Sequence, residues 1–128
     1  MPTRSYLDFH MPIKLILAFI LLATPLRATE SEVLRDKDTF LSVLEGRALT
    51  IGLFKLTLNV QPNGSLTGTA MGWDVTGSWA WKDGLFCREM DWSGYKIDYD
   101  CQLVEKVGEK LRFIAKYGKG QSADFRLK

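Results

Sequence analysis

Short runs of alternating apolar and polar residues fill the sequence from residue 47 to its end, and turn-forming residues interrupt them about every 8–12 positions. The alternation is typical of strands with one buried and one exposed face. The connections are too short to contain crossover helices, so neighbouring strands must be antiparallel. We expect strands over 47–52, 54–60, 66–70, 73–81, 85–90, 97–104, 111–117 and 123–127.

This pattern predicts an all-β fold of seven or eight strands with one short helix near the N-terminus. A meander of that length removes its exposed edges by closing on itself, which favours a small up-and-down barrel. An open sandwich is the alternative. The helix is expected over 36–46, where Asp36 and Asp38 are N-cap candidates, apolar residues follow at helical spacing, and Gly46 ends the run.

The first 28 residues are predicted to be a secretory signal. Lys14 precedes nine consecutive apolar residues, 15–23, which are followed by small and then polar residues. A stable membrane span needs about 20 apolar residues, so no span is expected after cleavage. Synthesis could start at Met1 or Met11. The sequence therefore divides into a signal over 1–28, a linker and helix over 29–46, and a barrel over 47–128, with a periplasmic or secreted location.

Cys87 and Cys101 are the only cysteines, and in an oxidising compartment they are expected to form a structural disulfide. Gly94 lies midway between them in a turn-like stretch, so a hairpin would place the two side by side. Such a loop stabilises the fold by about 3 kcal/mol in the simplest model. A redox pair would need closer spacing, and a metal site would need further ligands.

Charge and histidine content exclude several functions. The net charge of +2 comes from residues 1–28, so the remaining chain is balanced and lacks the basic footprint of a nucleic-acid-binding protein. The single histidine, His10, lies in the predicted signal, which leaves the barrel without a Ser-His-Asp triad or a histidine-ligated zinc.

No cofactor or metal is expected. Gly64, Gly68 and Gly72 are spaced as turn and bulge residues, with no glycine-rich loop that opens a helix to bind a dinucleotide. Four carboxylates flank the Gly94 turn and could form an acid pair or a calcium site, although a solvated edge of mixed charge is the plainer interpretation. They are Glu89, Asp91, Asp98 and Asp100.

Aromatic residues share one face of the strand over 73–81. Trp73, Trp79 and Trp81, together with Phe86 and with Phe54 and Phe113, are expected to form the core, and lining a ligand cavity is the alternative.

A separate set of residues is expected at the surface. Trp92 lies outside the alternation and is expected to be the most exposed tryptophan. Arg88 is expected on the face opposite the Cys87 sulfur, where it would pair with a carboxylate or meet an anionic partner. The candidate surface contacts are Arg88, Trp92, Asp98 and Asp100.

Residues 40–127 resemble a family of small exported proteins from alphaproteobacteria. The resemblance rests on the glycines 64, 68 and 72 and on the order Val-Thr-Gly-x-Trp-x-Trp over 75–81, Phe-Cys-Arg over 86–88 and Cys-Gln over 101–102. Members often carry the name dihydrodipicolinate reductase, which would imply NADPH-dependent reduction in lysine biosynthesis. The true reductase has a glycine-rich dinucleotide turn and a His-His-x-x-Lys segment, and no position here matches either. The resemblance therefore implies fold and location.

These observations favour a non-catalytic barrel that binds a small molecule or a periplasmic protein. One alternative is an inhibitor of a lytic enzyme or protease, which would use a protruding loop over 91–96. Another is the reductase activity that the family name implies.

Overall fold

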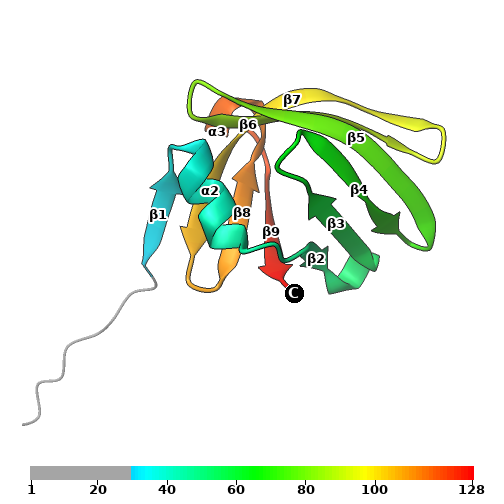
Figure 1. The fold of residues 1–128 in the computed structure, drawn as a ribbon, viewed down its shortest axis with the longest axis horizontal. Helices are drawn as coiled ribbons and strands as arrows, with labels where there is room; N and C mark the ends of the chain where they lie inside the picture. Colours follow the sequence, from blue (N-terminus) through cyan, green and yellow to red (C-terminus); the bar gives the residue numbers. More distant parts are fainter. Residues whose placement is uncertain (1–29) are drawn as a thin grey trace, which may run out of the picture.

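Residues 30–128 are those that the computed structural model describes, so the predicted signal and its two start sites lie outside the described residues. The elements of the described part are shown in Figure 1. In chain order they are β1 (Ser31–Leu34), α2 (Lys37–Leu44), β2 (Leu49–Ile51), η2 (Gly52–Phe54), β3 (Leu56–Val60), β4 (Ser65–Ala70), β5 (Trp73–Lys82), β6 (Leu85–Trp92), β7 (Tyr95–Val107), β8 (Lys110–Ile114), α3 (Ala115–Gly118) and β9 (Ser122–Leu127).

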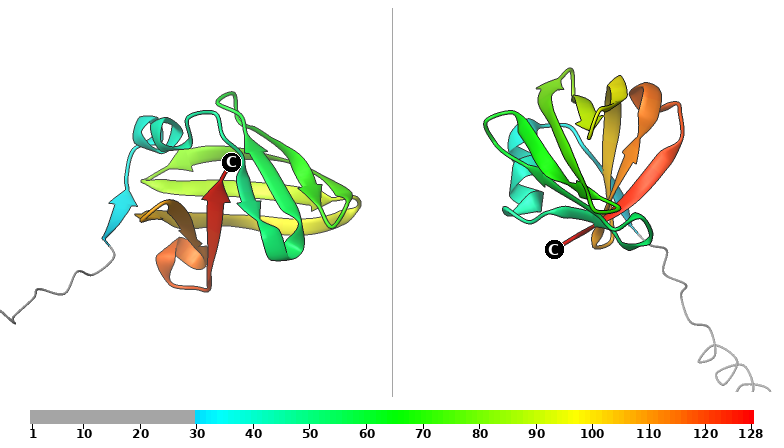
Figure 2. Two further views of the ribbon diagram at one scale, coloured as in Figure 1. Left: turned by 90° about the horizontal axis from the view of Figure 1, so that it is seen from below. Right: turned by 90° about the vertical axis from the view of Figure 1, so that its right-hand side faces the viewer.

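The strands β2 to β9 close into an antiparallel barrel, which confirms the predicted fold and excludes the sandwich. Each strand pairs with the next along the chain, and the ring closes where Leu49 of β2 lies opposite Leu127 of β9. Two backbone hydrogen bonds between Ala48 and Lys128, of 2.8 and 3.0 Å, extend this closing pair. Figure 2 shows the strands wrapping around a common interior.

One strand was not foreseen from the sequence. β1 pairs with the C-terminal half of β7, with Leu34 opposite Val104, and so adds an edge strand beside the closed barrel. The apolar signal that could have revealed it is short, since only Val33 and Leu34 are apolar in β1.

The helix α2 closes one end of the barrel. It follows Arg35, whose carbonyl accepts a hydrogen bond from the indole N–H of Trp81. Phe40 and Leu44 are buried, as expected from their helical spacing. Asp36 occupies the predicted N-cap position but its side chain makes no capping hydrogen bond, and the helix ends where Glu45 turns left-handed at a φ of 50°.

The core lies between α2 and the barrel wall. Phe40 stacks on Trp81 with ring centroids 5.0 Å apart, and it meets Phe86 and Phe113 at 5.4 and 6.2 Å. Trp79 stacks on Phe86 at 5.4 Å. These contacts fill the interior beneath the helix with aromatic rings.

Several strands differ from their expected limits, and β7 in particular is longer, covering Tyr95–Val107 in place of 97–104. Two strands are shortened because the backbone turns left-handed where the sequence gives no warning. The strand expected over 54–60 begins at Leu56, since η2 occupies Gly52–Phe54 and Lys55 has a φ of 47°. The strand expected over 111–117 ends at Ile114, since Lys116 and Tyr117 have φ values of 52° and 59°. Lysine and tyrosine rarely adopt this region.

Candidate functional site

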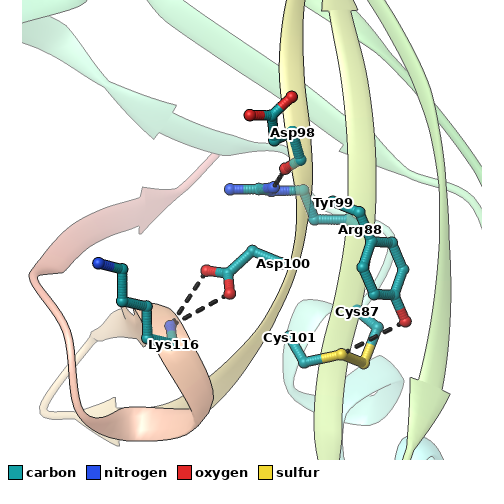
Figure 3. The surroundings of a disulfide bond; sticks show 7 residues. All are labelled: Cys87, Arg88, Asp98, Tyr99, Asp100, Cys101 and Lys116. Atoms are coloured by element: carbon teal, nitrogen blue, oxygen red, sulfur yellow. Dashed lines mark hydrogen bonds between the residues drawn. A yellow bond between two sulfur atoms is a disulfide. The ribbon is translucent and has the colours of Figure 1, made fainter.

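The two cysteines form a disulfide across the β6–β7 hairpin. Cys87 and Cys101 lie directly opposite each other in the register and are both buried. The hydroxyl of Tyr99 lies 3.4 Å from the Sγ atom of Cys101, as Figure 3 shows. Both cysteines are in the disulfide, so neither provides a thiol for redox chemistry or metal binding.

Arg88 lies on the face of β6 that points into the barrel. Successive strand residues point to opposite faces, so Arg88 shares the inward face of Phe86 while Cys87 points outward. Arg88 therefore lies opposite the sulfur, as expected, on a face that is the barrel interior and not the outer surface, and its side chain is partly exposed.

The guanidinium group of Arg88 has one described hydrogen-bond partner and no ion pair. Its Nη1 atom donates to the carbonyl of Asp98 at 2.7 Å (Figure 3). Among residues 30–128, the ion pairs are Arg47–Glu45 and Arg112–Asp124. Burial lowers the pKa of Arg88 below its usual value, and the nearby Asp100 carboxylate acts in the opposite direction.

A bulge in β7 presents the Asp98 carbonyl to Arg88. The register shifts between Arg88 and Met90, so two residues of β7, Asp98 and Tyr99, lie opposite Glu89 alone. Such a bulge leaves a residue outside the strand ladder and redirects its neighbours. The sequence contains no glycine here that would have signalled it.

A cavity of about 170 Å³ lies beside Arg88 in the interior. Most of its wall is apolar, and Arg88 and Gln102 are its polar members. Ala123 belongs to the same wall and is exposed, so the cavity opens to solvent beside the start of β9. The lining residues are Leu49, Leu58, Phe86, Arg88, Met90, Gln102, Phe113, Ala123 and Phe125.

The candidate aromatic residues do not form one group. Trp79 and Trp81 belong to the core, and their indole N–H groups donate to the carbonyls of Gln61 and Arg35. Phe86 is buried and contributes both to the core and to the cavity wall. Trp73 lies on β5 with Trp79 and Trp81. It is nevertheless 64% exposed, because it is the first residue of the strand and extends past the packed interior.

Trp92, expected to be exposed, is partly buried against the core. Its indole N–H donates to the carbonyl of Ala70 at 3.0 Å. Its register partner is the buried Val75, so Trp92 continues the inward face that the sequence pattern did not assign to it. Trp73 takes its place as the exposed tryptophan.

Two of the hairpin carboxylates support the backbone. The carboxylate of Asp91 accepts a hydrogen bond from the N–H of Gly94 at 2.7 Å, which tightens the β6–β7 turn. Asp100 accepts from the N–H of Lys116 at 3.1 and 3.2 Å, at the left-handed segment that follows β8 (Figure 3). Across the described part of the chain, no group of three His, Cys, Asp or Glu side chains could hold a metal ion.

The sequence analysis missed an exposed apolar surface, which we call the apolar end. It consists of Leu53, Phe54, Met71 and Trp73, which are 83%, 54%, 53% and 64% exposed. The amide of Met71 donates to the carbonyl of Phe54 at 3.2 Å, which brings η2 and the β4–β5 turn together. Phe54 was expected in the core, but η2 places it outside.

A wide surface depression of about 1120 Å³ shows no specific chemistry. It lies between the end of α2, the β7–β8 turn and the end of β9. Its charges are of both signs, and two of its cations, Arg47 and Arg112, already face carboxylates of Glu45 and Asp124. We therefore regard it as a solvated surface of mixed charge.

No helix within residues 30–128 has the length and apolar character needed to cross a membrane. Comparison of the chain with family models, with curated proteins and with solved structures gave no significant match.

Proposed function

We propose that this protein is exported and acts as a non-catalytic protein-binding module that contacts its partner through the apolar end. The observation that carries the proposal is the exposure of four large apolar side chains, Leu53, Phe54, Met71 and Trp73, on adjoining segments. Single exposed apolar residues are ordinary in proteins, whereas contiguous ones mark interaction surfaces. Tryptophan and methionine are also enriched in such interfaces.

The packed interior leaves no room for a ligand of ordinary size, which favours an outer surface as the contact with a protein partner. Cavities that enclose a typical organic ligand measure about 300–1,000 Å³. The interior cavity here measures about 170 Å³, because rings beneath α2 occupy the remainder. A larger ligand would have to displace the core.

The turn that carries Met71 also supports the proposal. Three two-residue hairpin turns have a left-handed residue followed by glycine: Met71-Gly72, Asp83-Gly84 and Ser93-Gly94. Aspartate and other small polar residues suit the first position, but methionine gains nothing there and has a φ of 53°. An exposed apolar residue held in a disfavoured conformation points to a role outside the fold.

Export is supported by the disulfide and by the order of residues in the predicted signal. Disulfides persist in oxidising compartments and are rare in the cytosol. The resemblance to small exported proteins agrees with this location. The reductase activity implied by that family's name is not part of the proposal, because no residue of the chain matches the reductase's catalytic segment.

A second candidate function is inhibition of a lytic enzyme or protease, through a different surface from the apolar end. The turn over 91–96 is short and held by the hydrogen bond from Gly94 to Asp91, so it is fixed enough to present one shape to an enzyme. If the partner is a lytic enzyme or a protease, the protein is expected to reduce that enzyme's activity.

Photo-crosslinking in the producing cells tests the proposal. A photoreactive amino acid replaces Trp73 in the full chain, and a matched variant carries it at Lys110, an exposed residue of β8. We expect a discrete protein adduct in the exported fraction from position 73 and none from position 110. The same adducts from both positions, or none from position 73, would contradict the role of the apolar end. Recovery of the protein only in the cytosol would contradict export.

A further inference from the structure

We propose that the interior cavity is a binding site for a small organic anion, with one carboxylate that pairs with Arg88 and an apolar body no larger than a single ring or short chain. The site is distinct from the apolar end, and neither proposal depends on the other.

The first argument is the free bonding capacity of Arg88. A guanidinium group carries five N–H donors, arranged so that two can bind one carboxylate together. Among the described residues, the Asp98 carbonyl is the acceptor at Nη1, 2.7 Å away. No described carboxylate forms an ion pair with Arg88, so its positive charge is partly buried without a direct counter-charge.

The carboxylate opposite Arg88 is already used elsewhere. Asp100 lies opposite Arg88 in the register, but its two oxygens accept hydrogen bonds from the backbone of Lys116. Asp100 therefore stabilises the segment after β8. Its negative charge also reduces the free-energy cost of burying the Arg88 cation, although the two groups form no ion pair. This arrangement holds Arg88 in position and leaves donors for a ligand.

The second argument is the wall of the cavity. Phe86, Phe113 and Phe125 supply rings, and Leu49, Leu58 and Met90 supply aliphatic surface. An inorganic anion could pair with Arg88 but would leave this apolar wall in contact with water. A ligand with an apolar body covers the wall and gains the hydrophobic contribution as well.

The third argument is size. A buried apolar cavity of about 150 Å³ in another protein accommodates benzene. The present cavity, about 170 Å³, is of that order. Benzoate and hexanoate therefore represent the ligand class, and entry is available beside the exposed Ala123.

Titration of the oxidised protein, as isolated from its producing cells, tests the site. Trp79 stacks on Phe86, which lines the cavity, so its fluorescence should report occupancy. Benzoate and hexanoate are compared with neutral benzyl alcohol, with cationic benzylamine and with acetate, which lacks the apolar body. We expect saturable binding of benzoate or hexanoate, at least about tenfold tighter than that of the neutral, cationic and small probes.

Two variants and a matched control locate the binding. Arg88→Met keeps much of the side chain's volume and should weaken benzoate binding at least about tenfold. Arg112→Gln removes the same charge from the opposite face of the barrel wall and should leave binding unchanged. Ala123→Phe should block entry while keeping Arg88, so it decides the question if Arg88→Met does not fold.

Several results would overturn the proposal. Neither carboxylate binding at millimolar concentration would show that no such site exists. Equal affinity for benzyl alcohol would show an apolar cavity without anion recognition, and equal affinity for acetate would show an ion-pairing arginine without a cavity. Unchanged binding in both Arg88→Met and Ala123→Phe would place the ligand elsewhere on the molecule.

Discussion

At the scale of single residues, two glycines lie where the neighbouring strand is too close to admit a side chain. A Cβ atom on Gly77 of β5 would overlap the backbone carbonyl of Glu89 and would lie 2.9 Å from the Cγ atom of Met90. A Cβ atom on Gly68 of β4 would overlap the carbonyl of Thr57 in the same way. These glycines let β3, β4, β5 and β6 approach closely enough to keep the small barrel closed.

Gly77→Val is therefore expected to lower the free energy of unfolding by at least about 1–3 kcal/mol, since an overpacked backbone contact must be relieved by moving a strand. Gly52→Ala is the control, because a Cβ atom there meets nothing within 4 Å. Denaturant unfolding of both variants measures the difference. Equal stability of Gly77→Val and the wild type would show that β5 and β6 separate easily.

Replacing Cys87 with Ser should lower the free energy of unfolding by about 2–4 kcal/mol, because the loop between the cysteines is no longer closed in the unfolded chain. The measurement is denaturant unfolding with and without a reductant. The reductant should destabilise the wild type and leave the variant unchanged. A variant as stable as the oxidised wild type would contradict a stabilising disulfide.

Met71→Asn separates stability from binding at the apolar end. Asparagine adopts the left-handed region more readily than methionine, so the variant should be more stable by up to about 1 kcal/mol. It should also lose the crosslinked adduct formed from position 73. A variant that is less stable than the wild type would show that Met71 serves the fold and not a partner.

At the scale of secondary-structure elements, α2 acts as part of the core. Its residues Phe40 and Leu44 lie in the same buried cluster as the barrel residues Val104 and Leu111. An isolated helix of this length is marginal in water, so contact with the barrel must keep it folded. The barrel in turn needs the helix, because without it the rings of Trp79 and Trp81 would face solvent.

Phe40→Ala should lower the free energy of unfolding by about 3–5 kcal/mol, the range for removing a large buried ring. Ser42→Ala, at an exposed position of the same helix, should have little effect. Thermal unfolding monitored by near-ultraviolet circular dichroism measures both. A small effect of Phe40→Ala would mean that α2 is only loosely attached.

The sequence predicted elements better than it predicted their limits and surroundings. Strands such as β4 and β5 were predicted because their apolar and polar residues alternate without interruption. The ends of β3 and β8 were not, because Lys55, Lys116 and Tyr117 adopt a backbone conformation that their side chains do not favour.

The candidate sites could not be predicted from the sequence, because they exist only once the barrel has closed. Arg88 was placed on the correct face of its strand, but only closure of the ring makes that face an interior. Likewise, the apolar end combines η2 with a turn that the sequence separates from it by more than a strand.

At the scale of the whole molecule, β9, the strand that closes the barrel against β2, is also joined by side chains to its other neighbour, β8. β8 and β9 carry the ion pair between Arg112 and Asp124, whose atoms approach to 2.8 and 3.1 Å. The hydrogen bond from Arg112 lowers the pKa of the Asp124 carboxyl below its usual value of 3.8. The pair is half-exposed, so solvent and salt weaken it.

A lowered carboxyl pKa in the folded state stabilises the protein above the usual pKa, and the contribution disappears as the pH falls through the lowered value. Asp124→Asn should therefore reduce the loss of stability on acidification below pH 3.8, with a small effect at neutral pH. Unfolding free energies measured across this range, at low and high salt, provide the test. Parallel curves for variant and wild type would show that the ion pair is not coupled to folding.

Because the ring is joined by the pairing of β2 with β9, the barrel cannot close before β9 has left the ribosome. The β6–β7 hairpin with its sulfur bridge is local and can assemble earlier. A nascent chain in which β9 is still missing would keep open edges on β2 and β8, and such a delay in closure would suit the proposed export of an unfolded polypeptide.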